Sequence, residues 1–199
     1  MNADSFRSGY AAVIAETLVM SPETGEHLML WTVRASVVCY VIALWRWLFC
    51  PVVAESSTRL SAQSGDRIYS ATWFAAWLLC VLHVICAFHF RHHWDHAVAI
   101  EHTAKMTENV VGIRWGGGLY INYLFLLLWG ASALDSLRYG GNRTENRRRL
   151  EVFLHAFAAF MMFNATAIFG PAWWWVPTIA VVAVILCRVF TASWVSTGN

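Results

Sequence analysis

The sequence predicts an all-α, polytopic integral membrane protein with about five transmembrane helices in one bundle. Of its 199 residues, 58% are hydrophobic and 13% are charged, whereas a soluble domain has about 25% charged residues. The apolar residues also gather in runs of about 20, the length of helix that crosses a hydrocarbon core of roughly 30 Å. This composition disfavours a soluble enzyme, and the net charge of +2 gives no sign of a nucleic-acid partner.

The five predicted spans follow the apolar runs in order. The first, 29–50, contains Arg34 and Arg46, but both lie near its ends, where a long side chain reaches the lipid headgroups. Gly170 and Pro171 separate the last two runs, because proline cannot continue the hydrogen-bond ladder of a helix. A re-entrant last segment is the alternative to a fifth full span. The four later spans are expected at 71–90, 118–137, 152–169 and 173–190.

Positive charge is divided unequally between the two sides of the membrane in this arrangement. Five spans place nine Lys and Arg residues on one side and five on the other, and the more basic side is expected to be the cytoplasm. The loop 138–151 alone holds five arginines. We therefore expect an extracytoplasmic N-terminal segment over 1–28, the helical bundle over 29–190 and a short cytoplasmic tail over 191–199, in the inner or plasma membrane of a cell.

Histidines are concentrated at the expected extracytoplasmic end of the second span. Six of the eight histidines lie between His83 and His102. If the helix continues beyond Phe90, a rotation of 100° per residue places four of them on one face, as two i, i+4 pairs. Imidazoles at that spacing can bind one transition metal ion, and nearby carboxylates could complete its ligands. The expected metal ligands are His89, His92, His93, His96, Glu101 and His102, with Glu108 as a further carboxylate.

The string His89-x-x-His92-His93 resembles one histidine box of the membrane fatty-acid desaturases and hydroxylases. That family holds two irons on several such boxes, so the resemblance implies iron and oxygen chemistry. The similarity covers five residues, and this chain has no further box of the kind. The family's boxes also face the cytosol, whereas the charge distribution places this one outside, so we do not carry the activity over.

Two interpretations of the histidine segment need no metal. In the first, the histidines with Arg91 and Trp94 form a wet amphipathic rim where a helix leaves the bilayer. In the second, some of them form a pH-responsive surface, since the charge of an imidazole changes near neutral pH. Both alternatives stay open at the level of sequence.

A polar position inside the second span indicates a second kind of contact. His83 lies about 12 residues into that span, near the bilayer midplane, where an ionisable group is costly. It faces away from the other histidines and is expected to bond Asn164 of the fourth span. Haem bound by two histidines is the alternative, with His83, His89 and His155 as candidates. His83 and His155 differ in depth by roughly 13 Å, so that pair fits poorly.

Three glycines, Gly116 to Gly118, lie at the start of the third span. Because glycine has no side chain, another backbone, a lipid or a cofactor can approach closely there. Asn122, with Tyr120 and Tyr123, lies within about two turns of the same membrane surface and could orient an imidazole ligand. The tyrosines could equally be interfacial anchors, with the glycines only a flexible start to the helix.

Together these features favour a metal or haem site that serves redox or oxygen chemistry on a lipophilic substrate. The cofactor would be iron, copper, zinc or haem b, with neutral imidazoles as ligands and Asn122 and Asn164 as supporting polar groups. The alternative is a non-enzymatic membrane subunit, scaffold or metal-handling protein whose histidines form a polar interfacial rim. Expected partners are the lipid bilayer, a lipophilic small molecule, and a second membrane protein or another copy of the chain.

Overall fold

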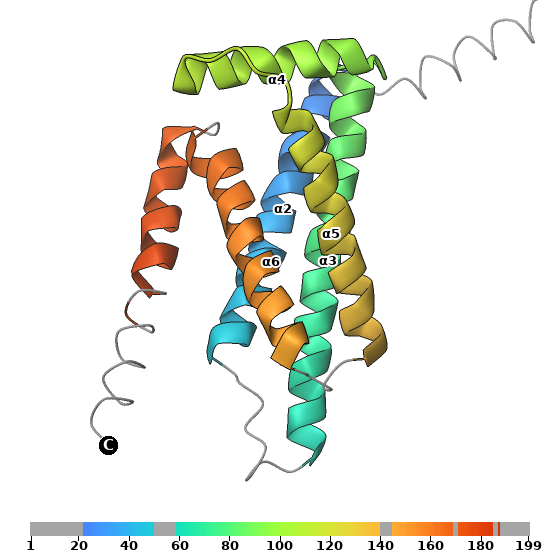
Figure 1. The fold of residues 1–199 in the computed structure, drawn as a ribbon, viewed down its shortest axis with the longest axis vertical. Helices are drawn as coiled ribbons and strands as arrows, with labels where there is room; N and C mark the ends of the chain where they lie inside the picture. Colours follow the sequence, from blue (N-terminus) through green and yellow to red (C-terminus); the bar gives the residue numbers. More distant parts are fainter. Residues whose placement is uncertain (1–21, 50–58, 140–144, 169–170, 185–186, 188–199) are drawn as a thin grey trace, which may run out of the picture. The chain divides into compact units, whose positions relative to one another are not determined.

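The computed structural model describes residues 22–49, 59–139, 145–168, 171–184 and 187. Every regular element in this part of the chain is a helix (Figure 1), so the all-α prediction is confirmed there. The predicted N-terminal segment before residue 22 and the tail 191–199 lie outside the described residues. The elements are α2 (Pro22–Phe49), α3 (Arg59–Phe90), α4 (His96–Val111), α5 (Gly118–Tyr139), α6 (Glu145–Phe163), η1 (Asn164–Ile168) and η2 (Ala172–Trp174).

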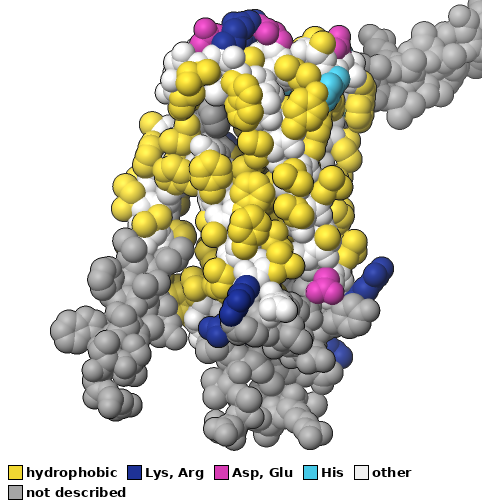
Figure 2. All heavy atoms as spheres, viewed as in Figure 1, with side chains coloured by type: hydrophobic (Ala, Val, Ile, Leu, Met, Phe, Trp, Pro, Cys, Tyr) yellow, Lys and Arg dark blue, Asp and Glu magenta, His cyan; other side chains and the backbone are white. Residues whose placement is uncertain are grey.

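Four of the described helices are long and apolar enough to cross a membrane. They cover Glu23–Phe49, Arg67–Phe90, Gly118–Arg138 and Arg148–Ile168, and a shorter apolar helix covers Ala172–Val184. On the face that Figure 2 shows, apolar side chains cover the helices and charged groups lie near their ends. Leu127, for example, is 71% exposed, which is costly in water and favourable in lipid. The helices therefore indicate an integral membrane protein.

The described residues form two compact units. The first holds α2, α3 and the first turn of α4 through Ala99, together with Ser136–Arg138 of α5. Small residues let α2 and α3 approach closely, since Ala43 and Ala76 are fully buried. The hydroxyl of Ser36, also fully buried, donates a hydrogen bond of 2.7 Å to the carbonyl oxygen of Ala76. This bond joins the middles of the two spans.

The second unit holds the rest of α4, α5 through Asp135, α6 and the elements that follow it. The rings of Phe125 and Phe157 meet edge to face, with centroids 5.1 Å apart, and pack α5 against α6. From Ile100 onward, α4 runs across the start of α5 instead of along it (Figure 1). At its other end, α6 passes into the π-helical turn η1, which contains the buried residues Thr166 and Ala167.

Candidate functional site: the histidine turn

The helix that carries the first histidines ends where the predicted second span ends and does not continue to His96. α3 ends at Phe90, and residues 91–95 form a turn in which His93 and Trp94 have positive φ angles of 49° and 60°. The turn is held by backbone bonds, including Trp94 N to Phe88 O at 2.9 Å. Asp95 then caps α4, because its Oδ1 accepts from the backbone N–H of Ala97 at 2.8 Å. The prediction of one continuous helical face through His96 is therefore wrong.

The turn gives the four histidines different surroundings. His92 is only 8% exposed and meets the ring of Phe88 edge to face at 5.6 Å. His96 is exposed and stacks on the same phenyl ring at 6.5 Å. His89 and His93 are also exposed. Among the described residues, no three His, Cys, Asp or Glu side chains are placed to hold a metal ion.

One imidazole of the turn has a defined hydrogen-bond role. Trp94 Nε1 lies 3.2 Å from Nδ1 of His89 and donates to it. An indole N–H is a donor only, so Nδ1 of His89 must carry a lone pair, and any ring hydrogen must sit on Nε2. This bond ties the last turn of α3 to the part of the turn with positive φ. His89 thus contributes to the shape of the turn.

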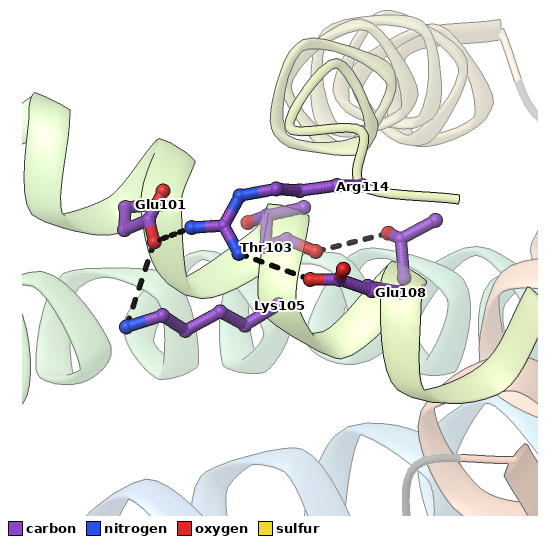
Figure 3. A network of polar contacts seen from close by, with 6 residues as sticks. Glu101, Thr103, Lys105, Glu108 and Arg114 are labelled. Carbon is purple, nitrogen blue, oxygen red and sulfur yellow. Dashed lines mark hydrogen bonds and ion pairs between the residues drawn. The ribbon is translucent and has the colours of Figure 1, made fainter. Parts of the chain in front are cut away.

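The predicted carboxylate ligands belong to an ion-pair network on α4. Arg114 lies between Glu101 and Glu108 and bonds both, at 3.0 Å in the case of Glu108 (Figure 3). Lys105 Nζ lies 3.5 Å from the carboxylate of Glu101. The hydrogen bond that Arg114 donates to Glu108 and the nearby charge of Glu101 raise the pKa of Arg114 above its usual value. Two cations therefore occupy the surroundings of Glu101, while the predicted ligand His102 is half-buried on the same helix.

The polar side chains expected to pair inside the membrane bond to backbone carbonyls. His83 Nδ1 lies 2.9 Å from the carbonyl oxygen of Met29 on α2, and since a carbonyl only accepts, that nitrogen carries the hydrogen. The Asn164 amide donates to Phe160 O, one turn earlier in its own helix, at 2.7 Å. His155, the other haem candidate, is buried in α6 of the second unit. Ligation of haem by these histidines stays a prediction.

The glycines before α5 permit a close helix contact, as the sequence predicts. A Cβ atom added to Gly116 would lie 2.8 Å from the carbonyl oxygen of Ile100 on α4. Tyr120 and Tyr123 contact each other edge to face, with ring centroids 6.3 Å apart. Asn122 is half-buried near them in the second unit. Its role in orienting a ligand remains a prediction.

Two features of the described residues were not predicted from the sequence. One is the bridging position of Arg114, which follows α4 after the glycine that ends the helix. The other is a cavity between α5 and α6 that brings Asp135 and Glu151 to one place. The available signal is their position at adjacent ends of the predicted spans 118–137 and 152–169. Comparison with known proteins gives no relative, since no family model, curated protein or solved structure matches the chain.

Proposed function

We propose that this protein is a non-enzymatic membrane subunit or scaffold whose residues 89–114 form a polar rim at the membrane–water boundary. The observation that carries this proposal is the end of α3 at Phe90, which separates the imidazoles into buried and exposed positions. Trp94, 62% exposed at this helix end, has the amphipathic ring that favours the interface. The rim is expected on the extracytoplasmic side, opposite the arginine-rich loop.

The internal pairing of the charges in this segment also supports the proposal. Arg114 and Lys105 are both paired with carboxylates of α4, which leaves the rim polar but nearly neutral. A rim of this kind can lie against headgroups or a partner protein without a strong charge of its own. A metal centre would instead need at least three ligands that converge on one point, and no three His, Cys, Asp or Glu side chains of the described residues do so.

Metal analysis of the full chain in mild detergent tests the proposal against the metal or haem alternative. We expect no stoichiometric iron, copper or zinc, and no Soret band in the visible spectrum. A metal present in fixed ratio, and lost when His93 and His96 are both replaced by alanine, would overturn the proposal. His27→Ala is the matched control, because His27 is an exposed histidine of α2 outside the predicted ligand set.

The depth of the rim gives a second, positive readout. In vesicles, the difference in tryptophan fluorescence between the wild type and Trp94→Phe reports on the indole of Trp94 alone. We expect this component to be quenched more by lipids brominated near the headgroup than by lipids brominated near the chain ends. The reverse order would place Trp94 inside the hydrocarbon and contradict the rim. A reporter fused after Arg148 tests the orientation, with cytoplasmic activity as the expected result.

A further inference from the structure

The last two residues of α4 are apolar and exposed, and they lie on the side of the helix that meets α5. At about 100° per residue, one arc of about 100° holds Ile100, Thr103, Val110 and Val111. Ile100 and Thr103 contact the glycines that open α5. Val110 and Val111 are exposed, Val111 by 60%. They therefore continue the α5-facing side of α4 beyond the contact with the glycines.

This side of α4 is directed toward the membrane. From Ile100 onward, α4 runs across the start of α5 (Figure 1), and α5 extends from there as a helix long and apolar enough to span. The side of α4 that meets the start of a span faces the bilayer. Val111 lies eight residues after Thr103, which is about 12 Å of helix. A helix with its side chains has a radius of only about 5–6 Å, so Val111 lies beside the end of α5 and not over it.

The charged side chains of α4 lie on the other side of the helix. Glu101, Lys105 and Glu108 are spaced i, i+4 and i+7, and their mean direction is about 140° from the middle of the apolar arc. Arg114 reaches back to this side and bonds both glutamates (Figure 3). Two carboxylates and two cations give this network no net charge. Contact with lipid here therefore depends on apolar area and not on anionic headgroups.

The segment that follows α4 adds two exposed apolar side chains. Ile113 is 65% exposed, and Trp115 is half exposed. The ring of Trp115 lies against Gly117 and fills the space that a side chain there would need. An indole prefers the membrane–water boundary, and this contact holds it at the start of a span. The exposed leucines of α5, such as Leu124, follow within the span. Apolar exposed surface thus continues from the span into residues 110–115.

We propose that residues 110–115, the anchor segment, insert among the lipids of the leaflet in which α5 begins, between headgroups and acyl chains. Val110, Val111, Ile113 and Trp115 contact lipid, and the charged side of α4 stays in water. Amphipathic helices in this position bury their apolar face about 5–10 Å deep. The partner is bilayer lipid, because the exposed side faces the bilayer and continues the lipid-facing surface of a span. This placement rests on the proposed function, which puts the rim at the membrane–water boundary.

The reaction of single introduced cysteines with a membrane-impermeant maleimide tests the anchor segment, with the full chain in phosphatidylcholine vesicles and the wild-type reaction subtracted. Val111→Cys places a thiol in the anchor segment. Asn109→Cys is the matched control, because Asn109 is exposed and lies about 160° around α4 from Val111. We expect Val111→Cys to react at least about tenfold more slowly, since the thiol must leave the lipid first and burial of a side chain of valine's size opposes that step by about this factor.

The lipid composition tests whether charge is involved. Because the network on α4 has no net charge, vesicles that contain phosphatidylglycerol should give the same ratio of rates as phosphatidylcholine alone. Equal rates for Val111→Cys and Asn109→Cys would overturn the proposal. Protection of Val111→Cys only in the presence of phosphatidylglycerol would also overturn it, since binding would then depend on charge.

Trp115 distinguishes a lipid cover from a protein cover. The difference in tryptophan fluorescence between the wild type and Trp115→Phe reports on this indole, and lipids brominated near the start of the acyl chains should quench it most. Slow reaction of Val111→Cys without such quenching would overturn the proposal, because protein would then cover the segment. Fast reaction of Val111→Cys with Trp94 at headgroup depth would overturn the anchor segment and leave the rim. Trp94 inside the hydrocarbon would overturn both.

Discussion

Replacing Gly116 with alanine should loosen the junction between α4 and α5. The added Cβ would lie 2.5 Å from Cγ2 of Ile100 and 2.8 Å from its carbonyl oxygen, whereas non-bonded carbon atoms prefer about 3.5–4.0 Å. The backbone carbonyl cannot rotate away as a side chain can, so α4 must move. Overpacking of this kind costs about 1–3 kcal/mol. If this free energy lowers the stability of α4 against local opening, the backbone amides of α4 should exchange hydrogen for deuterium roughly five to 150 times faster.

Hydrogen–deuterium exchange of peptides covering 100–117 measures this effect in detergent or nanodiscs. Gly118→Ala is the matched control, because its Cβ would meet only Cγ2 of Thr103 at 3.2 Å, a methyl group that can shift by a few tenths of an ångström. We expect little change in that variant. Exchange in Gly116→Ala within twofold of the wild type, or equal exchange in the two variants, would refute the close contact between Gly116 and Ile100.

Three other changes test separate contacts. Ser36→Leu should lower the free energy of unfolding by about 1–3 kcal/mol, because the larger side chain forces α2 away from α3. Ser36→Ala, which removes the hydroxyl bonded to Ala76, should lower it by about 0.6 kcal/mol. SDS titration followed by circular dichroism measures both, and equal losses would contradict the packing. Arg114→Gln should speed protease cleavage within 112–117. Because salt screens ion pairs, wild-type protein in 1 M salt should be cleaved at a similarly raised rate. Wild-type cleavage that does not depend on salt would count against the ion pairs. Trp94→Phe should speed amide exchange in the turn 91–95, because it removes the N–H that donates to Nδ1 of His89; unchanged exchange would contradict a role of this bond in holding the turn.

The helical fold could be predicted from the sequence because long apolar runs admit few alternatives in a membrane. The predicted second span ends where α3 ends, at Phe90, but periodicity could not predict the turn that follows. No glycine or proline lies between Phe88 and Ala97, and the chain turns there through positive φ angles at His93 and Trp94. Such angles are uncommon in residues with side chains. Asp95 was the available signal, since aspartate is a favoured residue immediately before a helix.

The candidate site was predicted less completely, for a related reason. A helical projection places residues by their angle around one axis, so a single break in the helix changes every angle after it. The contacts of Glu101 were beyond reach for a different reason, because Arg114 meets it only after the chain reverses beyond α4. The close approach at Gly116 could be anticipated, since the absence of a side chain is visible in the sequence.

The π-helical turn at the end of α6 bears on how polar residues in spans are interpreted. Widening a helix by one residue leaves a main-chain oxygen without its usual N–H partner, and hydrocarbon offers no water to replace it. Asn164 bonds Phe160 O and Thr166 bonds Met162 O, each at 2.7 Å, so side chains supply donors around this widened turn. A nonpolar substitute at either position would remove this donor from the oxygen. Asn164 and Thr166 therefore satisfy backbone acceptors within the span, a role that requires no ligand.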